Sequence, residues 1–235
     1  AGALFQFSFS TGDQLIVSDT YTRGASDVRA IEVSLPTLEA VSEEKKVKTW
    51  SLFSLFASSD AQVLAATPSY FELASLRLAS GRAISDEDSQ HYRQVAVLGA
   101  QAARELFPDL DPVGQRVKVN HLWLEVVGVL ADRDLSRDEF QGVRLGGDRN
   151  RVFVPLETSF KRLRFESLES ELDVVRLALS EDADPQTTAQ TVDYLLGRRH
   201  GAGGRRRGPG LLLGLIDPLP LLGREAFRRL RHQQL

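Results

Sequence analysis

The stretch ARELFPDLDPVGQRVKV, residues 103–119, decides the local fold because it joins a helix to a strand through one tight corner. The residues AQAARELF are dense in good helix formers, and Leu106 and Phe107 complete an apolar helix face. Pro108 cannot continue a helix, so we expect the helix to end there. No residue in the stretch is typical of catalysis, which favours a structural role for the corner.

The turn after this helix is DPVG, and the chain beyond it alternates apolar and polar residues. Proline presets one backbone dihedral and glycine tolerates positive φ, so Asp111, Pro112 and Gly114 predict a tight turn. The run QRVKVNHLWLEVVGVLAD predicts a hairpin of two strands, hinged near Asn120 and His121.

Both sides of this corner carry short, well-marked elements. PSYFELASLRLASGRAI predicts a helix and then a break at Gly81, SDEDSQ predicts an exposed acidic turn, and QVAVLG predicts a short strand ending at Gly99. Residues 133–150 are polar and rich in charge and glycine, which predicts a long exposed loop. RVFVPLETSFKRL predicts a strand that ends near Pro155, followed by a short helix.

The two ends of the chain predict further strands and helices around this unit. LFQFSFS, DQLIVSDTY and ELDVVRLALSEDAD indicate strands, and SLFSLFASSDAQVLAAT indicates two more. Residues 34–50 predict a helix capped by Ser34, in which EEKK forms a solvated face or turn. PQTTAQTVDYLLGRRHG predicts a helix that is capped by Asp184 and stops at Gly197 or Gly201.

The composition is that of an ordinary globular chain, with 235 residues of which 42% are hydrophobic and 26% charged. A formal net charge of −3 gives no whole-molecule attraction to nucleic acid, so we expect no nucleic-acid partner. The chain lacks cysteine, which excludes disulfides and a cysteine nucleophile. It also lacks methionine, and its most apolar run, LLLGLIDPLPLL, is too short to span a bilayer. We therefore expect an excised piece whose membrane attachment lies outside it.

Motifs for catalysis and cofactor binding are absent from the sequence. There is no phosphate-binding GxxxxGK[ST], no GxSxG nucleophile elbow and no HExxH zinc motif. No two of the 4 histidines have the spacing of metal ligands. We expect no catalytic, cofactor-binding or metal-binding residues, and no enzymatic activity in this chain.

Two acidic clusters admit an ion-binding interpretation. The DED cluster at residues 86–88 could hold a hard cation, but an acidic turn is the simpler interpretation. DRDLSRDEF, residues 132–140, spaces its oxygens as calcium loops do, yet Arg137 stands where such loops need glycine and Val143 where they need glutamate. An ion-binding or enzymatic module is therefore the alternative from another class.

A basic region follows the helix predicted for PQTTAQTVDYLLGRRHG. The tract GAGGRRRGPG predicts a flexible linker, and PLLGREAFRRLRHQQL predicts a basic amphipathic helix. No aromatic residues interleave with the arginines of the tract, so stacking on nucleic-acid bases is not indicated. We interpret residues 201–235 as a flexible basic tract and a membrane-proximal helix.

Taken in order, these pieces resemble the periplasmic core domain of MacB-type ABC transporter permeases. That family shows a Y-F segment, G-R, an acidic turn, a V-V-L-G strand, a helix ending in L-F, D-P-[IV]-G, two strands ending in V-[IV]-G-V, and V-[YF]-[IV]-P-L. The matching structural-motif residues are Tyr70, Phe71, Gly81, Gly99, Leu106, Phe107, Asp111, Pro112, Gly114, Gly128 and Pro155.

The resemblance implies an α+β fold. A porter-like β-α-β subdomain would be built from both chain ends, residues 1–66 and 151–200. A small α/β subdomain called Sabre-like would be inserted between them, over residues 67–150.

The resemblance also implies a function outside catalysis. We expect the domain on the periplasmic face of the bacterial inner membrane, passing conformational change from transmembrane helices to a periplasmic partner or cargo. The implied partners are a second permease copy, a cytoplasmic ATPase, and either a periplasmic adaptor or a lipoprotein carrier. A lipoprotein-releasing permease is the alternative within the fold, with residues 133–150 as its docking loop. A peptide- or adaptor-binding module unrelated to transport is a further hypothesis.

Overall fold

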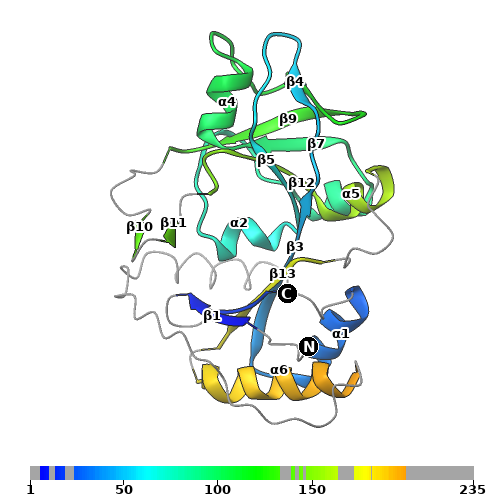
Figure 1. The fold of residues 1–235 in the computed structure, drawn as a ribbon, viewed down its shortest axis with the longest axis vertical. Helices are drawn as coiled ribbons and strands as arrows, with labels where there is room; N and C mark the ends of the chain where they lie inside the picture. The colour runs from blue at the N-terminus through cyan, green and yellow to red at the C-terminus, as the bar shows by residue number, and fades with distance from the viewer. Residues whose placement is uncertain are drawn as a thin grey trace, which may run out of the picture.

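The computed structural model describes residues 6–10, 14–18, 24–132, 139–140, 143–144, 147–163, 172–180 and 182–199. Figure 1 shows an elongated molecule in which the long strand β3 (Leu38–Val47) runs between two ends. One end holds α1 (Ala25–Ser34) and α6 (Pro185–Arg199), and we call it the α1–α6 end. The other, the β4 end, holds β4 (Leu52–Ser54) and α4 (Ala100–Leu106).

One mixed sheet of 11 strands runs through the whole molecule, in the order β1-β2-β13-β3-β5-β12-β7-β9-β8-β4, with β6 paired to β9. The pairs β5–β12 and β7–β9 are parallel and the others are antiparallel. The remaining strands are β1 (Gln6–Ser10), β2 (Gln14–Ser18), β5 (Gln62–Ala66), β6 (Leu78–Gly81), β7 (Val95–Leu98), β8 (Arg116–Val119), β9 (Leu122–Leu130), β12 (Arg151–Pro155) and β13 (Val174–Leu179). A separate pair joins β10 (Glu139–Phe140) to β11 (Val143–Arg144).

The central strands are buried on both faces, because successive side chains of a strand point to opposite sides. In β5, Val63 and Ala65 belong to one apolar cluster while Leu64 and Ala66 belong to another. The first cluster also takes in residues of α1, α4, α6 and α5 (Leu156–Arg162). The second packs under α2 (Ser69–Leu73). Continuous apolar runs such as VAVL in β7 are typical of strands covered on both faces.

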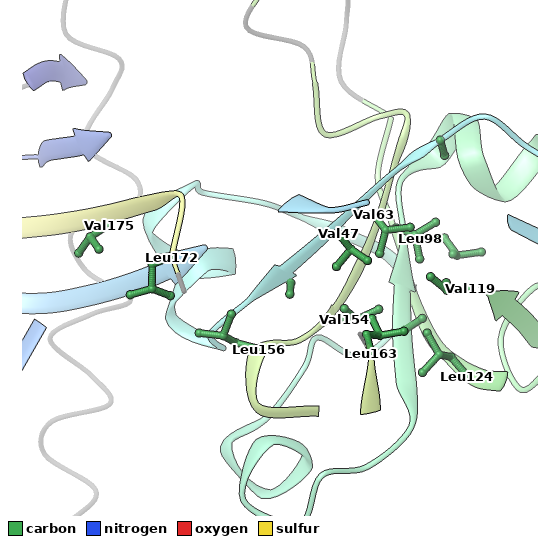
Figure 2. Packing of buried hydrophobic residues seen from close by; sticks show 14 of the residues in the cluster. Val47, Val63, Leu98, Val119, Leu124, Val154, Leu156, Leu163, Leu172 and Val175 are labelled. Atoms are coloured by element: carbon green, nitrogen blue, oxygen red, sulfur yellow. The ribbon is translucent and has the colours of Figure 1, made fainter. Parts of the chain in front are cut away.

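The larger apolar cluster is continuous along the long direction of the molecule. Figure 2 follows it from Val175 in β13, through Leu172 and Leu156, to Val119 and Leu124 near the β4 end. Burying one such side chain contributes about 1.5–3 kcal/mol. The two ends therefore share one core as well as one sheet.

Most of the predicted elements are confirmed. The two N-terminal strands, the pair β4 and β5, the helix α4, the hairpin β8–β9, the strand β12 with α5, and β13 all lie where the patterns place them. Asp184 caps α6 as predicted, since its carboxylate accepts a hydrogen bond from the backbone N–H of Thr187 at 2.9 Å. The α+β fold class is also confirmed.

The predicted helix over residues 34–50 is wrong. Ser34 is the last residue of α1, a helix that the patterns did not predict, and residues 38–47 form β3. The helical spacing of apolar residues is outweighed by pairing with β13 on one side of β3 and β5 on the other. EEKK is not a solvated face, because Glu44 and Lys45 are each 3% exposed.

Three smaller predictions also need correction. The acidic turn SDEDSQ is the helical turn α3 (Asp86–Gln90), capped by Ser85, with Asp88 fully buried. The described part of residues 133–150 contains the β10–β11 pair and a turn at 147–150, so it is not a featureless loop. Of the two predicted stops of α6, Gly197 lies within the helix, which continues to Arg199, and Gly201 lies outside the described residues. The predicted linker and basic helix of residues 201–235 lie outside the described residues.

The division into residues 1–66, 67–150 and 151–200 stays a prediction. The sheet passes through all three segments, since β12 lies between β5 and β7.

Candidate functional site

The strand β3 changes its partner at Glu44, midway between the two ends of the molecule. Residues 38–44 of β3 pair with β13, and residues 44–47 pair with β5. Glu44 stands opposite Val174 on one side and Ala66 on the other. This position, where the strands of the α1–α6 end meet those of the β4 end, is the waist of the sheet.

A chain of partly buried polar contacts crosses the waist. The Nε of Arg176, on β13, donates to the Glu44 carboxylate, and its guanidinium carbon lies 5.4 Å from the centre of the Tyr70 ring on α2. The Tyr70 hydroxyl donates to Oδ1 of Asp148 at 2.9 Å. Arg151, on β12, donates from Nη1 to the same Asp148 oxygen at 2.7 Å. We call these five residues the waist cluster, and it ties both halves of the sheet to α2.

Aromatic packing fixes the centre of the waist cluster. Tyr70 is 1% exposed, and its ring centroid lies 5.5 Å from that of Phe153 and 6.1 Å from that of Phe71. Offset or edge contacts of this kind stabilise aromatic pairs by about 0.5–1.5 kcal/mol beyond their buried area. The hydroxyl that links to Asp148 is therefore held in one place by its ring.

Burial dominates the electrostatics of the waist cluster. It raises the pKa of Glu44, and the charge and hydrogen bond of Arg176 oppose that rise. Burial, together with the charge of Asp148, also raises the pKa of Tyr70. Burial works against the charge of Arg176, but Glu44 holds its pKa above the ordinary value. The Glu44–Arg176 ion pair is thus largely shielded from water, which suits a structural contact rather than proton transfer.

The neighbouring residue, Glu43, carries a second charge at the waist. Burial, with Glu157 of α5 and Glu32 of α1 nearby, raises its pKa to about 7, against the opposing charge of Arg29. Its backbone N–H donates to the Thr67 hydroxyl at 3.0 Å, and its carbonyl accepts from the N–H of Thr67 at 3.1 Å. α5, which carries Glu157, packs on β3 and β5, so Glu43 lies next to a helix that contacts both strands.

At the α1–α6 end, one ion pair ties the end of the last described helix to the body. The Nε of Arg199, the final residue of α6, lies 2.8 Å from Oδ1 of Asp27 on α1. The Asp27 side chain is 1% exposed, whereas Arg199 is 42% exposed. α1 and α6 pack on each other, and α6 also packs on β2. A displacement of the C-terminal end of α6 would therefore act directly on α1.

The corner predicted from residues 103–119 lies at the β4 end, away from the waist cluster. Leu106 and Phe107 are buried, and Ser54 of β4 donates its hydroxyl to the Leu106 carbonyl at 2.7 Å. Oδ1 of Asp111 accepts from the N–H of Val113 at 3.0 Å, and Pro112 precedes Gly114, whose φ of +83° lies in the left-handed region. The corner joins α4 to β8 as rigid packing.

The other motif residues lie in three places: at the waist, in the β6–β9 pair and at the ends of β7 and β12. Tyr70 joins the waist cluster, and Phe71 packs beside it. Gly81 lies opposite Gly128 in register, and a Cβ at Gly81 would come within 2.2 Å of the Val127 carbonyl oxygen. Two further motif residues mark strand ends, Gly99 after β7 and Pro155 at the end of β12. Their assignment as motif residues of the family stays a prediction.

Four members of the waist cluster were missed by sequence reasoning: Glu44, Asp148, Arg151 and Arg176. One signal was present, since Arg176 interrupts the apolar strand VVRLAL. A charge in a buried strand needs a partner. The partner, however, lies 132 residues away in a segment that was interpreted as a solvated helix.

In both acidic clusters considered as ion-binding sites, a described carboxylate forms ion pairs with arginines. Asp88 accepts hydrogen bonds from Arg82, and a second guanidinium, that of Arg93, lies 3.9 Å from it. Asp132 lies 2.6 Å from Arg149 Nε and 3.0 Å from Arg104 Nη1. Residues 133–138 of the calcium-like run lie outside the described residues. Within the described part of the chain, no three His, Cys, Asp or Glu side chains are grouped as metal ligands would be, and none of its helices has the length and hydropathy of a membrane span.

These features define an α+β domain organised around buried structural contacts. The chain belongs to the family described as the MacB-like periplasmic core domain, which matches residues 1–194. It is 29% identical over 139 residues to the macrolide export ATP-binding/permease protein MacB of Bdellovibrio bacteriovorus, a match that covers 59% of this chain and 20% of that protein. The matched region thus spans about a fifth of the length of that relative.

Two solved structures share the fold. The periplasmic region of MacB from Actinobacillus actinomycetemcomitans matches with a TM-score of 0.62 at 19% identity, covering 81% of this chain and 85% of that one. The extracellular domain of the noncanonic ABC-type transporter YknZ from Gram-positive bacteria matches with a TM-score of 0.58 at 19% identity, covering 75% and 83%. The predicted resemblance to the MacB family is confirmed.

Proposed function

We propose that this chain is the periplasmic domain of an ABC exporter permease and that it passes movement from transmembrane helices to a periplasmic partner or cargo. Membership of the MacB-like periplasmic core domain family supports the setting. The observation that carries the mechanical role is the single sheet, with its continuous core, that joins the α1–α6 end to the β4 end.

The proposed role needs no reactive group in this chain. ATP would be hydrolysed on a cytoplasmic ATPase domain or subunit, and a second permease copy would complete the transporter. Movement would enter through α6, because its last residue is tied to the buried Asp27 of α1. It would then cross the waist cluster, where β3 passes from β13 to β5. A packed core transmits displacement because it resists compression.

The test uses the complete transporter in membrane vesicles, in which export and ATP hydrolysis are measured together. Arg199→Gln removes the charge that binds Asp27, and we expect it to keep ATP hydrolysis while lowering export several-fold. Arg198→Gln is the matched control, because the Arg198 guanidinium hydrogen-bonds to the hydroxyl of its exposed helix neighbour Tyr194 and, within the described part of the chain, forms no ion pair with α1. Wild-type export by the Arg199→Gln transporter would contradict the entry of movement through α6.

A further inference from the structure

The last strands of the sheet present aromatic side chains to solvent at the β4 end. Phe53 on β4 lies opposite Lys118 on β8, and Lys118 lies opposite Trp123 on β9. Their strand neighbours Leu52 and Val117 point into the core and are buried. The solvated face of an antiparallel sheet is usually polar. The exposed pair Arg116 and Glu125 follows that rule on this face, whereas Phe53 and Trp123 do not.

The segments on either side of β4 carry further exposed apolar side chains. Leu55 is 76% exposed and Phe56 55% exposed, and the Phe56 ring meets the edge of Phe107 at 6.1 Å between centroids. Trp50, just before β4, is 66% exposed. Single exposed apolar residues are ordinary, but contiguous groups mark interaction surfaces, and Trp and Phe are enriched there. Phe53, Lys118 and Trp123 form one contiguous group, with the Phe53 and Trp123 ring centroids 5.9 Å apart, and we call these three residues the aromatic corner.

The aromatic corner carries positive charge, although the whole chain has a net charge of −3. The Lys118 ammonium lies 5.5 Å from the centre of the Phe53 ring and 5.7 Å from that of Trp123. Within the described part of the chain, no carboxylate forms an ion pair with Lys118. The charge complement of this surface is a carboxylate flanked by apolar side chains.

Strand addition at β4 is blocked by the chain itself. The outer edge of β4 is already used by its own hairpin, because Ser59 N–H donates to the Leu52 carbonyl at 3.1 Å and Phe53 bridges Ser58. A partner would therefore bind through side chains rather than by extending the sheet.

We propose that the aromatic corner binds an acidic, apolar segment of a partner protein. A carboxylate of that segment meets Lys118, and its apolar side chains cover Phe53 and Trp123. The inference rests on the proposed function in one respect, because it takes the β4 end as the end that meets the partner. That end lies farthest from α6, where movement enters (Figure 1).

The probe is a random peptide library displayed on phage and selected on the 235-residue chain. We expect selected peptides to combine Asp or Glu with Leu, Phe or Trp. Their synthetic versions should lose about tenfold or more in affinity for Phe53→Ala and for Lys118→Glu, the range of an interface hot spot. Tyr194→Ala is the matched control, since Tyr194 is an aromatic residue on α6 that is 62% exposed. It should bind as the wild type does.

Two results would overturn the proposal: selection without acidic, apolar enrichment, or selected peptides that bind Phe53→Ala and Lys118→Glu as tightly as wild type. Thermal unfolding of each variant shows that lost binding is not lost folding. Peptide binding is measured independently of export, so a negative binding result would not contradict the proposed function. Failure of the Arg199→Gln test leaves peptide binding unaffected.

Discussion

The largely buried ion pair of Glu44 and Arg176 combines a desolvation penalty with an attraction between the two charges. Removing two charges from water is expensive, and their attraction offsets that cost only when geometry and further hydrogen bonds are good. Here the Glu44 side chain is 5% exposed and that of Arg176 21% exposed. The pair lies where β3 changes partner, so it specifies which strands meet there. The pair therefore contributes to the specificity of strand pairing, and removing only one of its two charges should strongly destabilise the fold.

Breaking the pair from one side should destabilise the chain far more than removing both charges. Glu44→Met or Arg176→Met alone leaves one buried charge without compensation and should lower the free energy of unfolding by about 3 kcal/mol. The double variant should cost much less than the sum. Urea unfolding of the 235-residue chain measures all three. Additive losses would show that the two residues are not coupled.

An exposed pair offers the control for this cycle. Arg104 and Asp132 lie 3.0 Å apart, but their side chains are 58% and 43% exposed. Exposed pairs contribute about 0–1 kcal/mol. Arg104→Met should therefore change stability by only about 0.5 kcal/mol or less.

Glu43 makes stability depend on pH in a defined direction. Its pKa is raised from 4.5 to about 7, so the native chain holds this proton more tightly than the unfolded chain does. The stabilisation that protonated Glu43 gives the native state is complete below pH 4.5 and is lost as the pH rises through about 7. Glu43→Gln stays neutral, so it should lose less stability than wild type across this window. Thermal unfolding of both proteins at several pH values compares the slopes, and equal slopes would contradict the assignment.

At the scale of elements, β6 and β9 approach each other more closely than side chains allow. Gly81 has φ of +72°, and its backbone lies against Val127 and Gly128 of β9. This contact explains why the predicted break at Gly81 is also the end of a strand. The edge of the sheet at β6 depends on a residue without a Cβ.

Gly81→Ala should therefore cost more than a glycine replacement in open space. Its Cβ would lie 2.2 Å from the Val127 carbonyl oxygen, so strain and displacement of β6 should lower the free energy of unfolding by about 2–3 kcal/mol. Gly114→Ala is the control, because its φ of +83° is similar but no atom lies within 4 Å of the added Cβ. We expect it to cost about 1–2 kcal/mol. Equal losses in urea unfolding would show that the close approach is not limiting.

Elements set by local chemistry could be predicted from the sequence, and those set by distant partners could not. The corner of residues 103–119 was predictable, since Pro108, Pro112 and Gly114 restrict the backbone themselves. The strand β3 was not, because its inward residues Ser42 and Glu44 are polar and hide the alternation. Two contacts of the waist cluster, Glu44–Arg176 and Tyr70–Asp148, join residues 132 and 78 positions apart, which no local pattern encodes.

At the scale of the whole molecule, we propose that the domain moves as one stiff body between the α1–α6 end and the β4 end. One sheet and one continuous core connect the α1–α6 end to the β4 end (Figures 1 and 2). If the domain instead bent at the waist during the transport cycle, movement at α6 would be absorbed before reaching the aromatic corner. Stiffness between the ends is therefore the central claim.

The most direct test measures that stiffness with spin labels in a complete transporter whose other segments are cysteine-free. This chain contains no cysteine, so labels can be placed by Val33→Cys on α1, where the side chain is 87% exposed, and by Leu110→Cys near the β4 end, where it is 46% exposed. We expect the Val33–Leu110 distance within one domain to stay constant between the nucleotide-free and ATP-bound states, while the distance between the Leu110 positions of two copies changes. A change in the distance within the domain, or no change between the copies, would contradict the account.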